Sequence, residues 1–90
     1  MSYDLTRIEY VIMNAMLENN ATDYMHSMSC EEIRDIEGHS KVTTIYKHIR
    51  ILEDLGLVTK GARIERANGY ILTGKGIGMI PKSRNTKENL

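Results

Sequence analysis

The chain lacks the features on which disulfides, membrane spans and export depend. It contains one cysteine, Cys30, which cannot form an internal disulfide, and this usage is typical of a reducing cytoplasm. No apolar run approaches the roughly 18 residues that cross a bilayer. The first ten residues have no basic start followed by an apolar stretch, so we expect no signal peptide. These absences predict a cytoplasmic protein without a membrane partner.

Motifs of catalysis and metal binding are missing as well. The sequence contains no H-E-x-x-H and no cysteine pair. Residues 74–78 are rich in glycine but lack the spacing, and the following Ser or Thr, of a phosphate-binding loop. The three histidines are scattered, and the six methionines are more typical of a core than of a copper site. We therefore expect neither an enzyme nor a bound metal or cofactor.

The charged residues are divided unevenly along a chain of 90 residues, a length that predicts one domain. The net charge is zero, which by itself argues against a nucleic-acid partner. Residues 1–40, however, contain two basic against eight acidic residues, a charge of −6. Residues 41–90 contain ten basic against four acidic residues, a charge of +6. This division predicts a basic side that meets phosphate, while the acidic side faces away or contacts a protein partner.

The acidic half predicts two helices and a short strand. Asp4 can cap a first helix that ends near Glu18 and has an apolar stripe along one face. The alternation over residues 24–28 predicts a short strand. Ser29 begins an S-x-x-E capping box, which predicts a second helix over residues 30–36 with Ile33 and Ile36 facing inward.

The most informative stretch follows, beginning with a third helix over residues 41–55. We expect Ser40 to cap this helix and Gly56 to end it. Its apolar residues recur every three or four positions and therefore share one inward face. They are Val42, Ile45, Ile49 and Leu52.

The outward face of this helix carries short hydroxyls and positive charge, which suit base edges and phosphates in a DNA major groove. Its residues are Lys41, Thr43, Thr44, Lys47 and His48, with Arg50 nearby. Thr43, Thr44 and Lys47 are the first choices for contact with bases or phosphates. His48 could donate to DNA, although an idle surface histidine is equally compatible. Tyr46 is expected to pack at the edge of the core, and the alternative is that it stacks near the DNA backbone.

A β-hairpin is expected over residues 58–73. Its strands are predicted at residues 58–64 and 70–73, with Ala67-Asn68-Gly69 as the turn. Arg63 and Arg66 flank the tip, where an arginine can enter a narrow minor groove or protect a strand edge by its charge. Lys60 is a further candidate for phosphate contact.

Two motifs and the order of elements resemble a winged helix-turn-helix. Residues 45–58, with the pattern I-x-x-x-I-x-x-L-E-x-L-G-L-V, are similar to the end of the recognition helix in bacterial winged-helix regulators. Residues 70–76, YILTGKG, are similar to the strand that closes the wing in MarR-like families. The resemblance implies an α+β fold of three helices and a two-stranded wing within residues 1–80. The polar residues 81–90 are expected to be a disordered tail.

The resemblance also implies a function. Helix 41–55 would enter the major groove, the wing at residues 58–73 would touch the backbone or minor groove, and such proteins often act as homodimers. Too few residues remain for the long dimerising helices of MarR-like proteins, so the first helix and Ile77–Ile80 are the expected dimer surfaces. The leading hypothesis is a small transcriptional regulator that binds double-stranded DNA. The alternatives are a plasmid or phage accessory factor that marks a replication, transfer or recombination site, and a protein-docking module.

Overall fold

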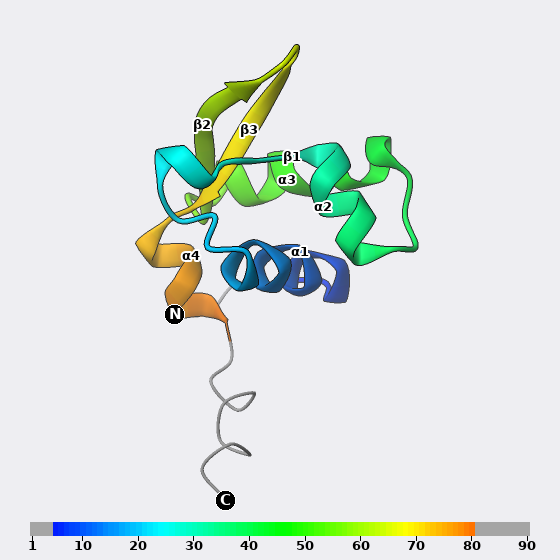
Figure 1. The fold of residues 1–90 in the computed structure, drawn as a ribbon. Coiled ribbons are helices and arrows are strands. Elements are labelled where there is room, and N and C mark those ends of the chain that lie inside the picture. The colour runs from blue at the N-terminus through cyan, green and yellow to red at the C-terminus, as the bar shows by residue number, and fades with distance from the viewer. Residues whose placement is uncertain (1–4, 81–90) are drawn as a thin grey trace, which may run out of the picture.

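A computed structural model describes residues 5–80, which form an α+β fold (Figure 1). The elements follow in the order α1 (Arg7–Glu18), the 3-10 turn η1 (Tyr24–His26), β1 (Met28–Ser29), α2 (Cys30–Glu37), α3 (Val42–Asp54), β2 (Val58–Ile64), β3 (Ala67–Leu72) and α4 (Gly74–Met79). The predicted class and the order of helices and hairpin are confirmed. The expected cap Asp4 and the expected tail at residues 81–90 lie outside the described residues.

Reciprocal capping boxes begin the first two helices. The Glu9 carboxylate accepts a hydrogen bond from the Thr6 backbone N–H at 2.9 Å, and the Thr6 hydroxyl accepts one from the Glu9 N–H at 3.4 Å. Thr6 therefore caps α1, which begins later than the sequence predicts. The predicted box of Ser29 and Glu32 at α2 is confirmed, with bonds of 2.9 and 3.2 Å.

Two local predictions before and after α2 need correction. The predicted short strand is present as β1, but only at Met28–Ser29, where it pairs with β3. Residues 24–26 form a 3-10 turn instead, because the Asp23 carboxylate accepts from the His26 backbone N–H and closes the turn. Ser40 does not cap α3, because its hydroxyl and its N–H both donate to the Glu37 carboxylate, at 2.9 and 2.7 Å. The N-cap position of α3 is Lys41, without a side-chain cap among the described residues.

One hydrophobic core joins the three longer helices to the sheet. It includes Ile12, Met13 and Met16 of α1, Ile33 of α2, Ile45, Ile49 and Leu52 of α3, and Leu57, Tyr70 and Leu72 of the hairpin region. The predicted inward face of α3 is therefore confirmed, with Val42 half-buried at its edge. The prediction for Ile36 is wrong, since its side chain is 45% exposed.

Within residues 5–80 the strands form one antiparallel sheet in the order β1-β3-β2. Ile64 pairs with Ala67, so the hairpin turn is Glu65-Arg66, and Glu65 takes the positive φ of 56° that such a turn needs. The predicted turn at residues 67–69 is therefore wrong. Gly69 lies in β3, where a Cβ would meet the Ala62 carbonyl oxygen. Its lack of a side chain serves close packing instead of a turn.

The chain after the hairpin forms a short helix that the sequence analysis missed. The Thr73 hydroxyl accepts from the Gly76 N–H at 3.0 Å and begins α4. In Figure 1, α1 and α4 lie on the side of the molecule away from the hairpin tip. In the part of the chain that the structure describes, no helix is both long and apolar enough to cross a membrane.

Candidate nucleic-acid interface

The outer face of α3 presents polar side chains because its rotation is set by the core. Ile45 and Ile49 are fully buried, and each residue advances the helix by about 100°. Lys47, two positions from both, therefore points away from the core, and it is exposed together with Thr43. Thr44 is half-buried, which leaves Thr43 as the hydroxyl better placed to meet another molecule. Lys41 is exposed at the start of the helix.

His48 lies elsewhere than the sequence predicts. Its Nδ1 is 2.8 Å from the Glu9 Oε2 of α1, and the two side chains are only 15% and 4% exposed. The expectation that His48 belongs to the outward face is therefore wrong. The side chain fastens α3 to α1, and Glu9 serves both this contact and the cap of α1. Charged residues are seldom buried without such a partner. The presence of Glu9 beside the apolar stripe of α1 could therefore have indicated that a polar partner lies on another helix.

Tyr46 and Arg50 form a surface pair that the sequence analysis did not propose. The expected packing of Tyr46 against the core is wrong, since 44% of its side chain is exposed. The Arg50 Nη1 donates to the Tyr46 hydroxyl at 3.4 Å, and its Cζ lies 5.9 Å from the ring centroid. This hydrogen bond raises the pKa of Arg50. The spacing of four residues on one helix face could have indicated the pair.

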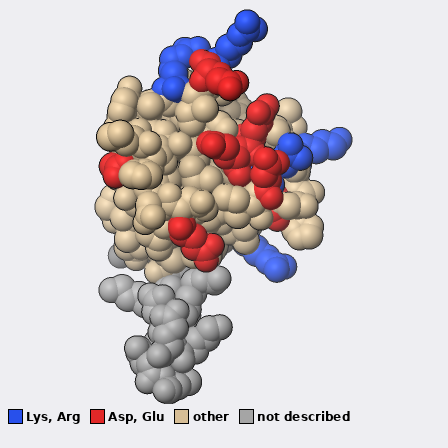
Figure 2. Space-filling model, viewed as in Figure 1, with Lys and Arg blue, Asp and Glu red and all other residues tan. Residues whose placement is uncertain are grey.

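The hairpin carries three exposed cations, Lys60, Arg63 and Arg66. The Arg63 Nη2 donates to the Arg66 carbonyl oxygen at 3.3 Å, so the two arginines share the tip with Glu65 between them in sequence. Figure 2 shows basic side chains projecting from the top of the molecule, where Figure 1 places the hairpin tip. The structure thus presents positive charge at the end of a projecting ribbon.

A groove of about 740 Å³ separates α2 from the hairpin tip. Thr43 and Tyr46 of α3 line it, with Arg66 on the hairpin side. The α2 side is acidic, with Glu31, Glu32 and Asp35, and Figure 2 shows acidic side chains gathered over this region. Of the two alternatives for the acidic half, facing away from the basic side is therefore wrong at α2, whereas contact with a protein partner stays a prediction. The three acidic residues of α2 are called the acidic wall below. A phosphate would be repelled at the acidic wall and attracted at the hairpin.

Comparison with solved structures places this arrangement in a known fold. TubR from Bacillus megaterium pBM400 matches with a TM-score of 0.73 and 18% identity, over 84% of this chain and 82% of that chain. A MarR family protein from Bacillus stearothermophilus matches with a TM-score of 0.72 and 20% identity, over 97% and 56%. The structure of an S. aureus MepR–DNA complex matches with a TM-score of 0.72 and 15% identity, over 96% and 67%. The fold is a winged helix-turn-helix.

These similarities concern structure. No protein-family model matches the sequence, and no curated protein matches it either. The chain spans about half the length of the MarR family protein. By its position in this fold, α3 corresponds to the element that is called the recognition helix, and the β2–β3 hairpin corresponds to the wing; the two names refer to position alone.

The winged helix brings most of the predicted contact residues to its recognition helix and wing. The exposed ones are Lys41, Thr43, Lys47, Arg50, Lys60, Arg63 and Arg66. Thr44 is half-buried, and His48 is held by Glu9. DNA contact by each of these residues stays a prediction, as does a homodimer.

Proposed function

We propose that this chain binds double-stranded DNA in a sequence-specific manner and acts as a small transcriptional regulator. The observation that carries the proposal is the exposed face of the recognition helix, with its hydroxyl and cations, beside a wing with three exposed cations. The likeness to the MepR–DNA complex supports it, because that protein meets DNA with the same fold. The proposal extends this behaviour to the present chain.

In the proposed complex the front of the recognition helix enters the major groove. Thr43 reads base edges, and Lys47 contacts a phosphate. Lys41 stands at a helix start whose first amides have no side-chain cap among the described residues, so that phosphate can be held there. Arg63 and Arg66 of the wing meet the backbone or the minor groove. The acidic wall of α2 keeps phosphates on the side of the wing.

A second candidate is a plasmid or phage accessory factor that marks a replication, transfer or recombination site. The match with TubR favours it, because that protein comes from the replicon pBM400 and shares the winged helix over 82% of its chain. Both candidates require specific DNA binding and differ in where the preferred site lies. A site that overlaps a promoter supports the regulator, and a site at an origin or transfer region supports the accessory factor.

The test is selection of binding sequences from a random duplex library, followed by titration of the selected duplex against salt. An enriched motif, repeated about 10 base pairs apart if a dimer binds, is the expected result. Lys47→Ala should weaken binding to every duplex and reduce the salt slope by about 0.9. Thr43→Ala should instead relax the preference at particular base pairs, and Thr44→Ala should have the smaller effect.

The matched control is Arg7→Ala, which removes an exposed cation from α1, far from the wing. It should leave the salt slope unchanged. Failure of the wild-type chain to bind any duplex at micromolar concentration and low salt would refute the proposal and favour a protein-docking module.

A further inference from the structure

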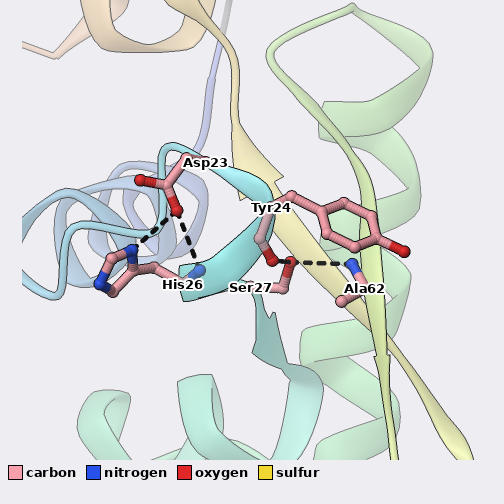
Figure 3. Close-up of polar contacts among 5 residues, drawn as sticks. All are labelled: Asp23, Tyr24, His26, Ser27 and Ala62. Atoms are coloured by element: carbon pink, nitrogen blue, oxygen red, sulfur yellow. Dashed lines mark hydrogen bonds and ion pairs between the residues drawn. The ribbon is translucent and has the colours of Figure 1, made fainter.

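A segment outside both the recognition helix and the wing crosses the middle of β2. Figure 3 shows the Ser27 hydroxyl between the Tyr24 carbonyl and the Ala62 backbone N–H of β2. The hydroxyl accepts from the Ala62 N–H at 2.9 Å and donates to the Tyr24 oxygen at 2.8 Å. The Ser27 side chain thus contacts a residue 35 positions further along the sequence, Ala62.

The wing is irregular at the point that Ser27 touches. The pairing of β2 with β3 shifts register between Lys60 and Arg63. Such a bulge leaves a residue out of the ladder, bends the strand and increases its twist. The Ser27 hydroxyl supplies a partner for the Ala62 amide inside this bulge.

Two glycines make room for the serine. A Cβ on Gly61 would meet the Ser27 hydroxyl, and a Cβ on Gly69 would lie 2.7 Å from the Ser27 Cβ. Ser27 is therefore closely packed between β2 and β3, and its hydrogen bond is partly buried.

The crossing segment is itself held in place. The Asp23 carboxylate accepts from the His26 N–H at 3.0 Å and lies 2.7 Å from the His26 Nδ1. This contact lowers the pKa of Asp23. Ser27 follows directly and is thus presented to the wing from a closed turn.

We propose that Ser27 is the positioning residue of the wing, because its hydroxyl sets the bend at Ala62 and hence where Arg63 and Arg66 meet DNA. The inference rests on the proposed DNA-binding function. The wing extends about 10 Å beyond Ala62, three residues of strand at about 3.3 Å each. A change of roughly 15° in the bend moves the tip by about 2.5 Å, enough to break a hydrogen bond to phosphate.

The experiment measures the effect of Ser27→Ala on affinity for the selected duplex in two backgrounds. In the otherwise wild-type chain we expect a loss of about tenfold, the effect of one charge-assisted hydrogen bond. In the Arg63→Ala/Arg66→Ala background we expect less than about a twofold loss, because the contacts that Ser27 positions are already gone. An equal loss in both backgrounds would overturn the proposal.

Thr22→Ala is the matched control, since Thr22 is an exposed hydroxyl residue in the same segment, and it should change neither affinity nor salt slope. Circular dichroism reports whether Ser27→Ala is folded. If it is not, Gly61→Ala replaces it, because the added Cβ displaces the Ser27 hydroxyl. The same dependence on background is expected, and its absence overturns the proposal.

Failure of the proposed function is distinguishable from failure of this inference. If the wild-type chain binds no duplex, the wing is followed by NMR in the absence of DNA. The Ala62 amide should then exchange faster in Ser27→Ala than in wild type, with altered contacts across the Arg63 and Asn68 pair and unchanged core amides. Unchanged exchange at Ala62 and an unchanged wing would refute the positioning role.

Discussion

Removal of the His48 imidazole should destabilise the fold while leaving the charge of the proposed DNA-binding face unaltered. His48 and Glu9 are paired at 2.8 Å between α3 and α1. The variant His48→Ala leaves the Glu9 Oε2 buried without this partner, whereas the other carboxylate oxygen keeps its bond to the Thr6 N–H. The prediction therefore separates a structural role for His48 from the DNA contact that the sequence suggests.

The magnitude follows from burial. An unsatisfied buried acceptor costs about 1–3 kcal/mol, and the nearly complete burial of Glu9 places the loss at about 2 kcal/mol. One kcal/mol shifts the melting temperature of a domain this small by about 4–8 °C. We therefore expect a decrease of about 8–16 °C. Such a loss is a large part of the roughly 5–13 kcal/mol expected for a chain of this length.

The assay is thermal unfolding followed by circular dichroism at neutral pH, with two control variants. His39→Ala removes an exposed histidine and should change the free energy of unfolding by less than about 0.5 kcal/mol. Glu9→Gln keeps an acceptor for Thr6 and a polar partner for His48, so it should cost less than His48→Ala. Equal melting temperatures for His48→Ala and His39→Ala would refute the reasoning, as would a reduced salt slope of DNA binding in a fully stable His48→Ala.

Three further predictions concern packing, DNA affinity and pH. Gly69→Ala should lower the free energy of unfolding in urea by about 3 kcal/mol through overpacking. Gly78→Ala is the control and should be neutral or stabilising, because its Cβ would meet nothing within 4 Å in the described chain. Similar free energies of unfolding for the two variants would contradict this account. Glu31→Gln should raise DNA affinity about twofold at low salt by removing a repulsive charge some 10 Å from phosphate, and an unchanged affinity would place the DNA elsewhere. The backbone N–H groups of His39 and Ser40 donate to the Glu37 carboxylate and lower its pKa. The resulting stabilisation is present above about pH 4.3, the ordinary pKa of a glutamate, and is lost as the pH falls through the lowered pKa. Glu37→Gln should therefore reduce the fall in the free energy of unfolding at acid pH, measured by urea denaturation, and an unchanged fall would count against this account.

Local chemistry explains what could be predicted from the sequence. The repeat of three and four positions placed Ile45, Ile49 and Leu52 in the core, because helical geometry alone decides which positions share a face. Gly38 and Gly56 take positive φ values of 83° and 80° at the ends of α2 and α3, where glycine has little steric cost. The bounds of β2 and the capping box of α2 depend on equally short stretches of chain.

The errors arose where a second group competed for a residue. Ser40 is of a residue type that often caps helices, but its hydroxyl and N–H donate to the Glu37 carboxylate instead of serving α3. Asn68-Gly69 has the composition of a turn, but Gly69 is needed where β3 packs against Ala62 and Ser27. For Ser40 the competing group lies three positions away in sequence, whereas for Gly69 the deciding groups come from other parts of the chain.

By itself, the sequence determined the periodic faces, most helix ends, the hairpin and the division of charge, since these depend on residues within a few positions of one another. The tertiary structure alone decided that His48 turns to Glu9, 39 positions away, that Ser27 contacts the middle of β2, and that the acidic wall of α2 adjoins the recognition helix. Periodicity states which way a side chain points, whereas its partner depends on how the elements pack. The residues of the candidate interface could therefore be identified from local sequence pattern, whereas the shape and boundaries of the interface depend on how the elements pack.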